Sequence, residues 1–117
     1  MSIQHNPADV LYSRVVVRLR EGGLTAQEVA HLTGVSERQV HRWSTGASRP
    51  EGDARHRLLE VNYVVEQLRE IYTDEGVEIW LHGRNKALDG RRPIQLLQSG
   101  EFEPVLAIIE ALNEGAM

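Results

Sequence analysis

The 117-residue chain has no cysteine and few aromatic residues. Without cysteine no disulfide framework can form, and we expect a reducing, cytoplasmic setting. Aromatic residues make up 5% of the sequence and all hydrophobic residues 41%, so aliphatic side chains must fill the core. The sequence has no apolar run of about 18 residues and no basic, apolar start followed by a cleavage site. We therefore expect neither a membrane span nor a targeting signal.

The chain also lacks an excess of basic residues, since its formal net charge is −4. The charges are divided unevenly. Residues 1–57 hold eight arginines against six acidic residues, whereas residues 58–117 hold five basic residues against eleven acidic ones. Within residues 38–57, five arginines face two acidic residues and leave a charge of +3. Such a local patch can contact nucleic-acid phosphates on an acidic protein, and the acidic half indicates a separate protein partner.

Helix signals run through the whole chain, and no strand alternation is visible, so the sequence predicts an all-α fold. We expect an N-terminal helix-turn-helix bundle, a long central helix and a small C-terminal helical domain. The first helix starts at Pro7, ends near Arg20, and has a core stripe of Leu11, Val15 and Leu19. The later helices are expected at 50–72, 74–82, 93–97 and from between 101 and 104 to 115, with a short turn at 84–88.

Residues 24–46 have the pattern of a helix-turn-helix. Thr25 and Glu28 are spaced as a capping box, and Gly34 sits where the first short helix must end. Ser36 and Gln39 form a second capping box directly afterwards. The helix that follows, 37–45, is the expected recognition helix, with Val40 and Trp43 on its buried face.

This stretch resembles the Xre-type helix-turn-helix, and the matching residues are Ala30, Gly34, Val35, Ser36, Val40, Trp43 and Gly46. A plain helical hairpin without a ligand is the alternative. At 100° per residue, Arg38, Arg42 and Thr45 fall opposite Val40, with Gln39 and His41 beside them. Arginine can pair with guanine and glutamine with adenine in the major groove. The candidate DNA-binding residues are Arg38, Gln39, His41, Arg42, Thr45 and Arg49. A merely solvated face is the alternative for them. One such module reads few base pairs, so we expect a homodimer on operator DNA.

A second pattern lies in the C-terminal half, formed by Trp80, Leu81, Asn85, Leu88, Gly90, Pro93, Leu96, Leu97, Gly100, Val105, Leu112 and Gly115. It resembles the C-terminal toxin-binding domain of the Xre/MbcA/ParS-type antitoxins. Together the two resemblances cover about residues 10–115. The pattern departs at Arg84, where the family commonly has proline.

The resemblance implies a type II antitoxin. Such a protein neutralises a RES-domain, NAD-degrading toxin by covering its active-site entrance, and represses its own operon through the helix-turn-helix. The candidate toxin-binding residues are Arg84, Asn85, Lys86, Arg91, Arg92, Asn113, Glu114 and Met117. The implied regions are 1–57 for DNA binding, 58–72 for a connecting helix and 73–117 for toxin binding. Asn85 could instead only cap the short turn, and Arg91 and Arg92 could be solvated charges.

Catalysis by this chain is not expected, nor is a cofactor. The sequence has no phosphate-binding glycine loop and no nucleophile–base pair. Glu75, Glu78 and His82 share one helical face and could hold a divalent metal, but a solvated acidic face explains them better, so we expect no metal. The competing function is a free-standing repressor whose C-terminal half dimerises or senses a ligand.

Overall fold

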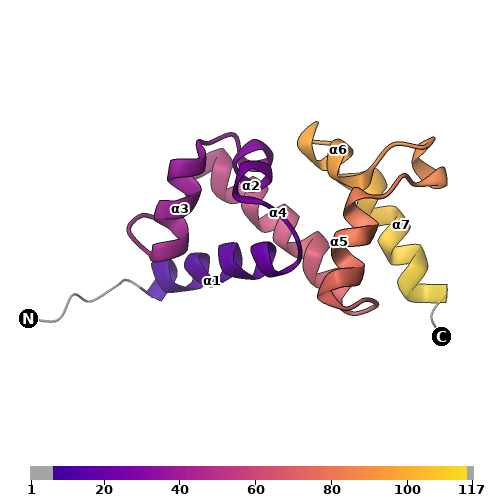
Figure 1. The fold of residues 1–117 in the computed structure, drawn as a ribbon, viewed down its shortest axis with the longest axis horizontal. Helices are drawn as coiled ribbons and strands as arrows, with labels where there is room; N and C mark the ends of the chain where they lie inside the picture. The colour runs from indigo at the N-terminus through magenta and orange to yellow at the C-terminus, as the bar shows by residue number, and fades with distance from the viewer. Residues whose placement is uncertain (1–6, 116–117) are drawn as a thin grey trace, which may run out of the picture.

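The computed structural model describes residues 7–115, which form seven α-helices and one short 3₁₀ helix (Figure 1). The predicted all-α fold is confirmed. The helices, in chain order, are α1 (Pro7–Glu21), α2 (Ala26–Thr33), α3 (Glu37–Thr45), α4 (Gly52–Arg69), α5 (Asp74–His82), η1 (Lys86–Leu88), α6 (Pro93–Gln98) and α7 (Phe102–Gly115). Outside the helices, the described chain has an isolated antiparallel bridge between Asn85 and Arg91. No described helix is long and apolar enough to cross a membrane.

The buried face of α1 differs from the predicted stripe. Leu11 is 63% exposed, whereas Val16 and Leu19 are fully buried and Val15 packs partly against the core. A step of four residues turns about 40° further than one full helical turn, so a strict four-residue stripe drifts around the helix. The core face of α1 is centred on Val16 and Leu19, and Leu11 has drifted off it.

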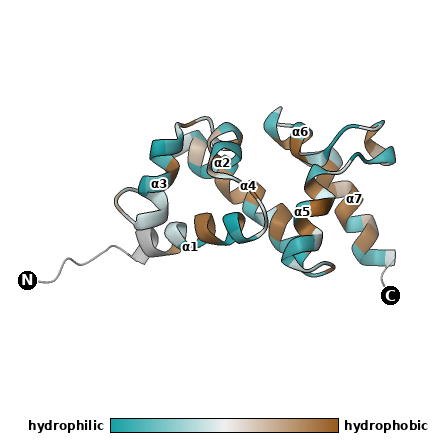
Figure 2. Cartoon of the chain, in the orientation of Figure 1, coloured by the Kyte–Doolittle hydropathy of each residue, from teal (hydrophilic) through white to brown (hydrophobic). Residues whose placement is uncertain are grey.

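Helix α4 runs through the middle of the molecule and contributes to both ends of the core (Figure 1). Its buried residues are Leu58, Val61, Val64, Val65 and Leu68. It is shorter than predicted, because it begins at Gly52 and ends at Arg69 instead of running from Pro50 to Tyr72. Buried residues from the N-terminal and C-terminal parts form one hydrophobic cluster. Figure 2 shows the brown segments of α4, α5 and α7 where these helices meet.

The C-terminal helices α5, α6 and α7 pack on one another and on the end of α4. Val77 and Leu81 of α5 are fully buried, as are Val105 and Ile109 of α7. Trp80 is partly buried against the same core. The predicted starts of α5 after Thr73 and of α6 at Pro93 are confirmed. At this end of the molecule the loop between α5 and α6 projects away from α3 (Figure 1).

Candidate functional site

The first helix of the helix-turn-helix is fixed by the capping box that the sequence predicts. The Glu28 amide donates to Thr25 Oγ1 at 3.0 Å, and the Thr25 amide donates to Glu28 Oε1 at 2.9 Å. At the other end Gly34 adopts a left-handed conformation, with φ of 76°, and its amide donates to the Ala30 carbonyl. Both ends of α2 are therefore set by short-range bonds, which fix where α3 can start.

Helix α3 has half of its predicted capping box. The Ser36 hydroxyl accepts a hydrogen bond from the Gln39 amide at 3.1 Å, as expected. The Gln39 side chain does not reach back to Ser36, however. Its Nε2 donates to Ser48 Oγ at 2.9 Å and ties the helix to the loop that follows. One of the two Nε2 hydrogens of Gln39 is thus used within the protein, while its second hydrogen and its Oε1 are not involved in this bond.

The outer face of α3 carries the remaining candidates for DNA contact. Arg38, His41 and Arg42 are exposed, while Val40 and Trp43 are almost fully buried. Thr45 is also exposed, and its hydroxyl donates to the Arg42 carbonyl at 3.2 Å. The other arginines of the basic segment 38–57, which are Arg49, Arg55 and Arg57, are exposed too. Figure 2 shows hydrophilic residues along α3. The helix thus rests on the core by one face and presents cations on the other.

The loop between α5 and α6 is held by its own hydrogen bonds. Asn85 Oδ1 accepts from the Ala87 amide at 2.9 Å, so Asn85 does cap η1. The Asn85 amide donates to the Arg91 carbonyl at 3.1 Å. Arg84 Nη1 donates to the Gly90 carbonyl at 3.2 Å, and Arg91 Nε donates to the Leu88 carbonyl at 3.1 Å. The conformation of the loop is therefore supported by hydrogen bonds between its own residues.

Basic side chains are concentrated on this loop. Its basic residues are Arg84, Lys86, Arg91 and Arg92, against the single acidic residue Asp89. Leu88 is buried and anchors the loop to the core. Arg84, Lys86 and Arg91 are exposed and Arg92 is partly exposed. This gives a loop charge of +3 on a half of the chain whose charge is −6.

The predicted tail contacts lie at the end of α7. Asn113 is partly exposed and Glu114 exposed, whereas Met117 lies outside the described residues. In Figure 1, α3 lies towards one end of the molecule, and the loop after α5 lies at the other end with α7. The candidate DNA-binding residues on α3 therefore lie apart from both groups of candidate toxin-binding residues.

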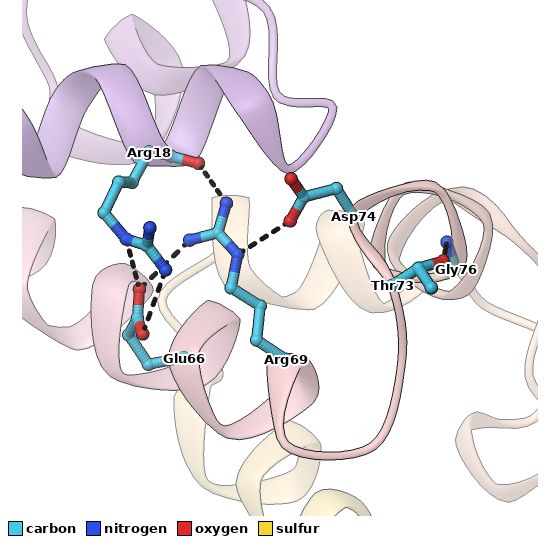
Figure 3. A network of polar contacts seen from close by, with 6 residues as sticks. All are labelled: Arg18, Glu66, Arg69, Thr73, Asp74 and Gly76. Atoms are coloured by element: carbon cyan, nitrogen blue, oxygen red, sulfur yellow. Dashed lines mark hydrogen bonds and ion pairs between the residues drawn. The ribbon is translucent and has the colours of Figure 1, made fainter.

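A polar network that the sequence did not predict joins the two parts of the molecule (Figure 3). Arg69, whose side chain is only 11% exposed, donates to Glu66 Oε1 at 3.0 Å, to Asp74 Oδ1 at 2.9 Å and to the Arg18 carbonyl at 2.6 Å. Arg18 Nε in turn donates to Glu66 Oε1 at 3.1 Å. The hydrogen bond from Arg18 holds the pKa of the Glu66 carboxyl below its usual value, against the opposing effect of burial. Helices α1, α4 and α5 meet at this network.

A second polar contact crosses from α5 to α2. His82 Nε2 lies 2.7 Å from Glu28 Oε2, and His82 Nδ1 lies 2.8 Å from the Glu78 carbonyl oxygen. Both oxygens are acceptors, so only the protonated ring can satisfy both contacts. Burial disfavours that charged ring, but the bonds to Glu78 and Glu28 outweigh it and raise the pKa of His82. A metal would have to displace one of these bonds to reach the ring.

Comparison with known proteins identifies the family of the chain. Residues 67–115 match the antitoxin Xre/MbcA/ParS C-terminal toxin-binding domain. The mycobacterial cidal antitoxin MbcA of Mycobacterium tuberculosis is 36% identical over 107 residues, which are 92% of this chain and 95% of MbcA. The chain belongs to the Xre/MbcA/ParS antitoxin family. MbcA of Mycobacterium bovis matches to the same extent.

A solved structure from this family is similar to the chain in both fold and sequence. In the crystal structure of the M. tuberculosis MbcT–MbcA toxin–antitoxin complex, one chain superimposes with a TM-score of 0.78 at 35% identity. The match covers 92% of this chain and 97% of the other. The resemblance that the sequence predicted is therefore confirmed, and it extends over both the helix-turn-helix and the C-terminal helices.

Proposed function

We propose that the chain is a type II antitoxin that binds a RES-domain, NAD-degrading toxin and covers its active-site entrance. The observation that carries the proposal is the full-length similarity to MbcA, including the chain from the MbcT–MbcA complex. The basic loop at 84–92 supports a charged protein contact, because its arginine and lysine side chains are exposed or partly exposed. Charge complementarity speeds association and selects partners. The other contacts are proposed at Asn113, Glu114 and Met117 on the C-terminal tail.

Co-expression of the chain with a RES-domain toxin, sought in the neighbouring gene, tests this proposal. The intact antitoxin should restore both growth and cellular NAD, and the two proteins should co-purify. In the charge-reversal variant Lys86→Glu/Arg92→Glu, the toxin dose that the cells tolerate should fall by about tenfold or more. This corresponds to a loss of about 1.4 kcal/mol or more of binding free energy. The matched control, Arg14→Glu/Arg20→Glu on exposed positions of α1, should protect fully. Equal protection by both variants would refute the loop contact. Unchanged NAD in cells expressing the toxin alone would refute the toxin chemistry.

Removal of residues 113–117 tests the tail separately. We expect the shortened chain to keep its helical circular dichroism, since no residue of this segment is fully buried among those described. Neutralisation should weaken, because the segment is proposed to block the toxin's entrance. Full protection by the shortened chain would contradict the proposed role of the tail.

We further propose that a homodimer of the chain represses its own operon through α3. The support is the exposed basic face of that helix, with Arg38 and Arg42 at its centre, and the helix-turn-helix caps around it. Arg42→Ala should abolish a gel shift on the region upstream of the gene, whereas Arg20→Ala, another exposed arginine, should not. Unchanged affinity of Arg42→Ala would rule out this role, and a monomer in solution would rule out the dimer.

A further inference from the structure

Trp43 of α3 has a buried polar group that makes no hydrogen bond. The residue is 1% exposed and packs in the hydrophobic core. In the part of the chain that the structure describes, its Nε1 is buried and has no hydrogen-bond partner. An indole N–H can only donate, and a buried donor without an acceptor destabilises a fold. Such a group is rare in proteins and requires a physical explanation.

A pocket lies on the side of α3 that contains Trp43. Its volume is about 440 Å³. Ser36 and Gln39, at the start of α3, line it together with Trp43. Arg49 and Glu51, from the segment that leads into α4, line the opposite part. The unpaired indole therefore belongs to a side chain that forms part of a pocket wall.

The polar groups of this pocket favour a ligand that accepts hydrogen bonds. Trp43 and Arg49 can only donate, and Gln39 Nε2 has a second hydrogen besides the one that it gives to Ser48. The Ser36 hydroxyl can donate too, since its oxygen already accepts from the Gln39 amide. The start of α3 adds the partial positive charge of a helix N-terminus. Glu51 brings one negative charge, which the charge of Arg49 offsets. Phosphate has enough acceptor oxygens for these donors.

The pocket also lies beside the face of α3 that carries the candidate base contacts. At about 100° per residue, Gln39 falls between Arg42 and Trp43, about 60° from the first and about 40° from the second. A recognition helix in the major groove has a phosphate backbone on each side, and contacts to these phosphates fix its position. The flank of α3 that carries the pocket therefore faces such a backbone when Arg42 faces the bases.

We propose that this pocket binds one backbone phosphate of the operator and that the Trp43 N–H donates a hydrogen bond to it. The inference rests on the proposed repression through α3. Because Nε1 is covered in the unbound chain, side chains that line the pocket must move when the phosphate enters. The new bond satisfies a donor that has no partner before binding, so it adds to the affinity for DNA of any sequence.

Trp43→Phe tests the role of the N–H, because it removes the donor and keeps an aromatic ring in the core. The matched control is Trp80→Phe, which changes the second of the two tryptophans in the sequence. Gel-shift titration should show about tenfold weaker operator binding by Trp43→Phe, the effect of one hydrogen bond to a charged group. Unrelated duplexes should lose the same factor, since a phosphate contact carries no sequence information. Trp80→Phe should bind as the wild type does.

Duplexes with a single methylphosphonate linkage test the contact from the DNA side. Neutralising the phosphate that enters the pocket should weaken wild-type binding by about tenfold and Trp43→Phe binding by about twofold or less. Fluorescence gives a measurement that does not depend on the folding of Trp43→Phe. In Trp80→Phe the tryptophan emission comes from Trp43 alone, and it should change when the operator binds. The duplex that is neutral at the contacted linkage should not produce this change.

The same emission, titrated with inorganic phosphate, separates a free ion from the operator backbone. We expect no change, because a single ion lacks the other contacts of the duplex. A saturable change with inorganic phosphate would overturn the assignment to the operator. Normal operator binding by Trp43→Phe, or an emission of Trp43 that does not respond to the operator, would overturn this inference alone. A wild-type chain that binds no operator would overturn the proposed repression and this inference with it.

Discussion

Replacing Gly23 by alanine tests the packing of α5 against the helix-turn-helix, and Gly34→Ala is its matched control. Each glycine ends a helix with a positive φ, 91° at Gly23 and 76° at Gly34. At both positions the amide of the next residue bonds back to a carbonyl in the last turn of the helix. The backbone strain that alanine introduces should therefore be similar at the two sites.

The surroundings of the two glycines differ sharply. A Cβ on Gly34 would meet no atom within 4 Å, so only backbone strain remains, about 1 kcal/mol. A Cβ on Gly23 would lie 2.4 Å from the Glu78 Cβ and 2.5 Å from its Cγ. Atoms cannot approach so closely, so α5 must move. Overpacking of this kind destabilises the fold by a further amount of about 1–3 kcal/mol. We expect Gly23→Ala to lower the free energy of unfolding by about 2–4 kcal/mol in total.

Urea denaturation followed by circular dichroism measures both free energies, provided that unfolding is two-state. Adding Glu78→Ala to Gly23→Ala should recover part of the loss, since it removes the crowding Cγ and Cδ but leaves the Cβ. If the two glycine variants lose the same free energy within about 0.5 kcal/mol, α5 does not press on the turn, and the packing argument fails.

Two further predictions concern α5. Leu81→Ala, at a fully buried position, should lower the free energy of unfolding by about 2–5 kcal/mol, whereas Ile79→Ala, 66% exposed, should change it by less than about 0.5 kcal/mol; equal losses would contradict the assigned core face. Because the pKa of His82 is raised above its usual 6.5, the stability that it adds relative to His82→Gln should be complete below that pH and be lost as the pH rises through the folded pKa. Denaturation of both proteins between about pH 5.5 and pH 9 measures this difference, and a constant difference would refute the charged contact with Glu28.

Short-range signals in the sequence located most of the helix ends. The Thr25–Glu28 capping box, the left-handed Gly34 and the Ser36 cap occur as predicted. Each of these features depends on residues within four positions of one another, so the local sequence contains all the partners. The cap formed by Asn85 is of the same kind.

Contacts between distant residues could not be read in the same way. The Gln39 side chain satisfied the spacing of a capping box, yet it bonds Ser48, because a loop nine residues later folds back beside it. Glu75, Glu78 and His82 looked like one polar face, but the face that makes contacts begins at Asp74. The four-residue spacing of the acidic and basic side chains was visible in the sequence, while the partners on other helices were not.

The double use of α5 has a consequence for mutational data on this family's toxin-binding domain. The matched region begins at residue 67, so it includes Arg69 and the whole of α5, although some of these side chains contact the helix-turn-helix. Substitutions along α5 should therefore separate into three groups by position. Substitutions of the buried Val77 and Leu81 should affect folding. Substitutions of Asp74 and His82 should affect how the two parts of the molecule pack together, because both side chains bond residues outside α5. Substitution of the exposed Glu75 should have neither effect. A loss of neutralisation in the second group would not by itself place a residue in the toxin interface, because a changed position of α5 can weaken binding without a lost contact.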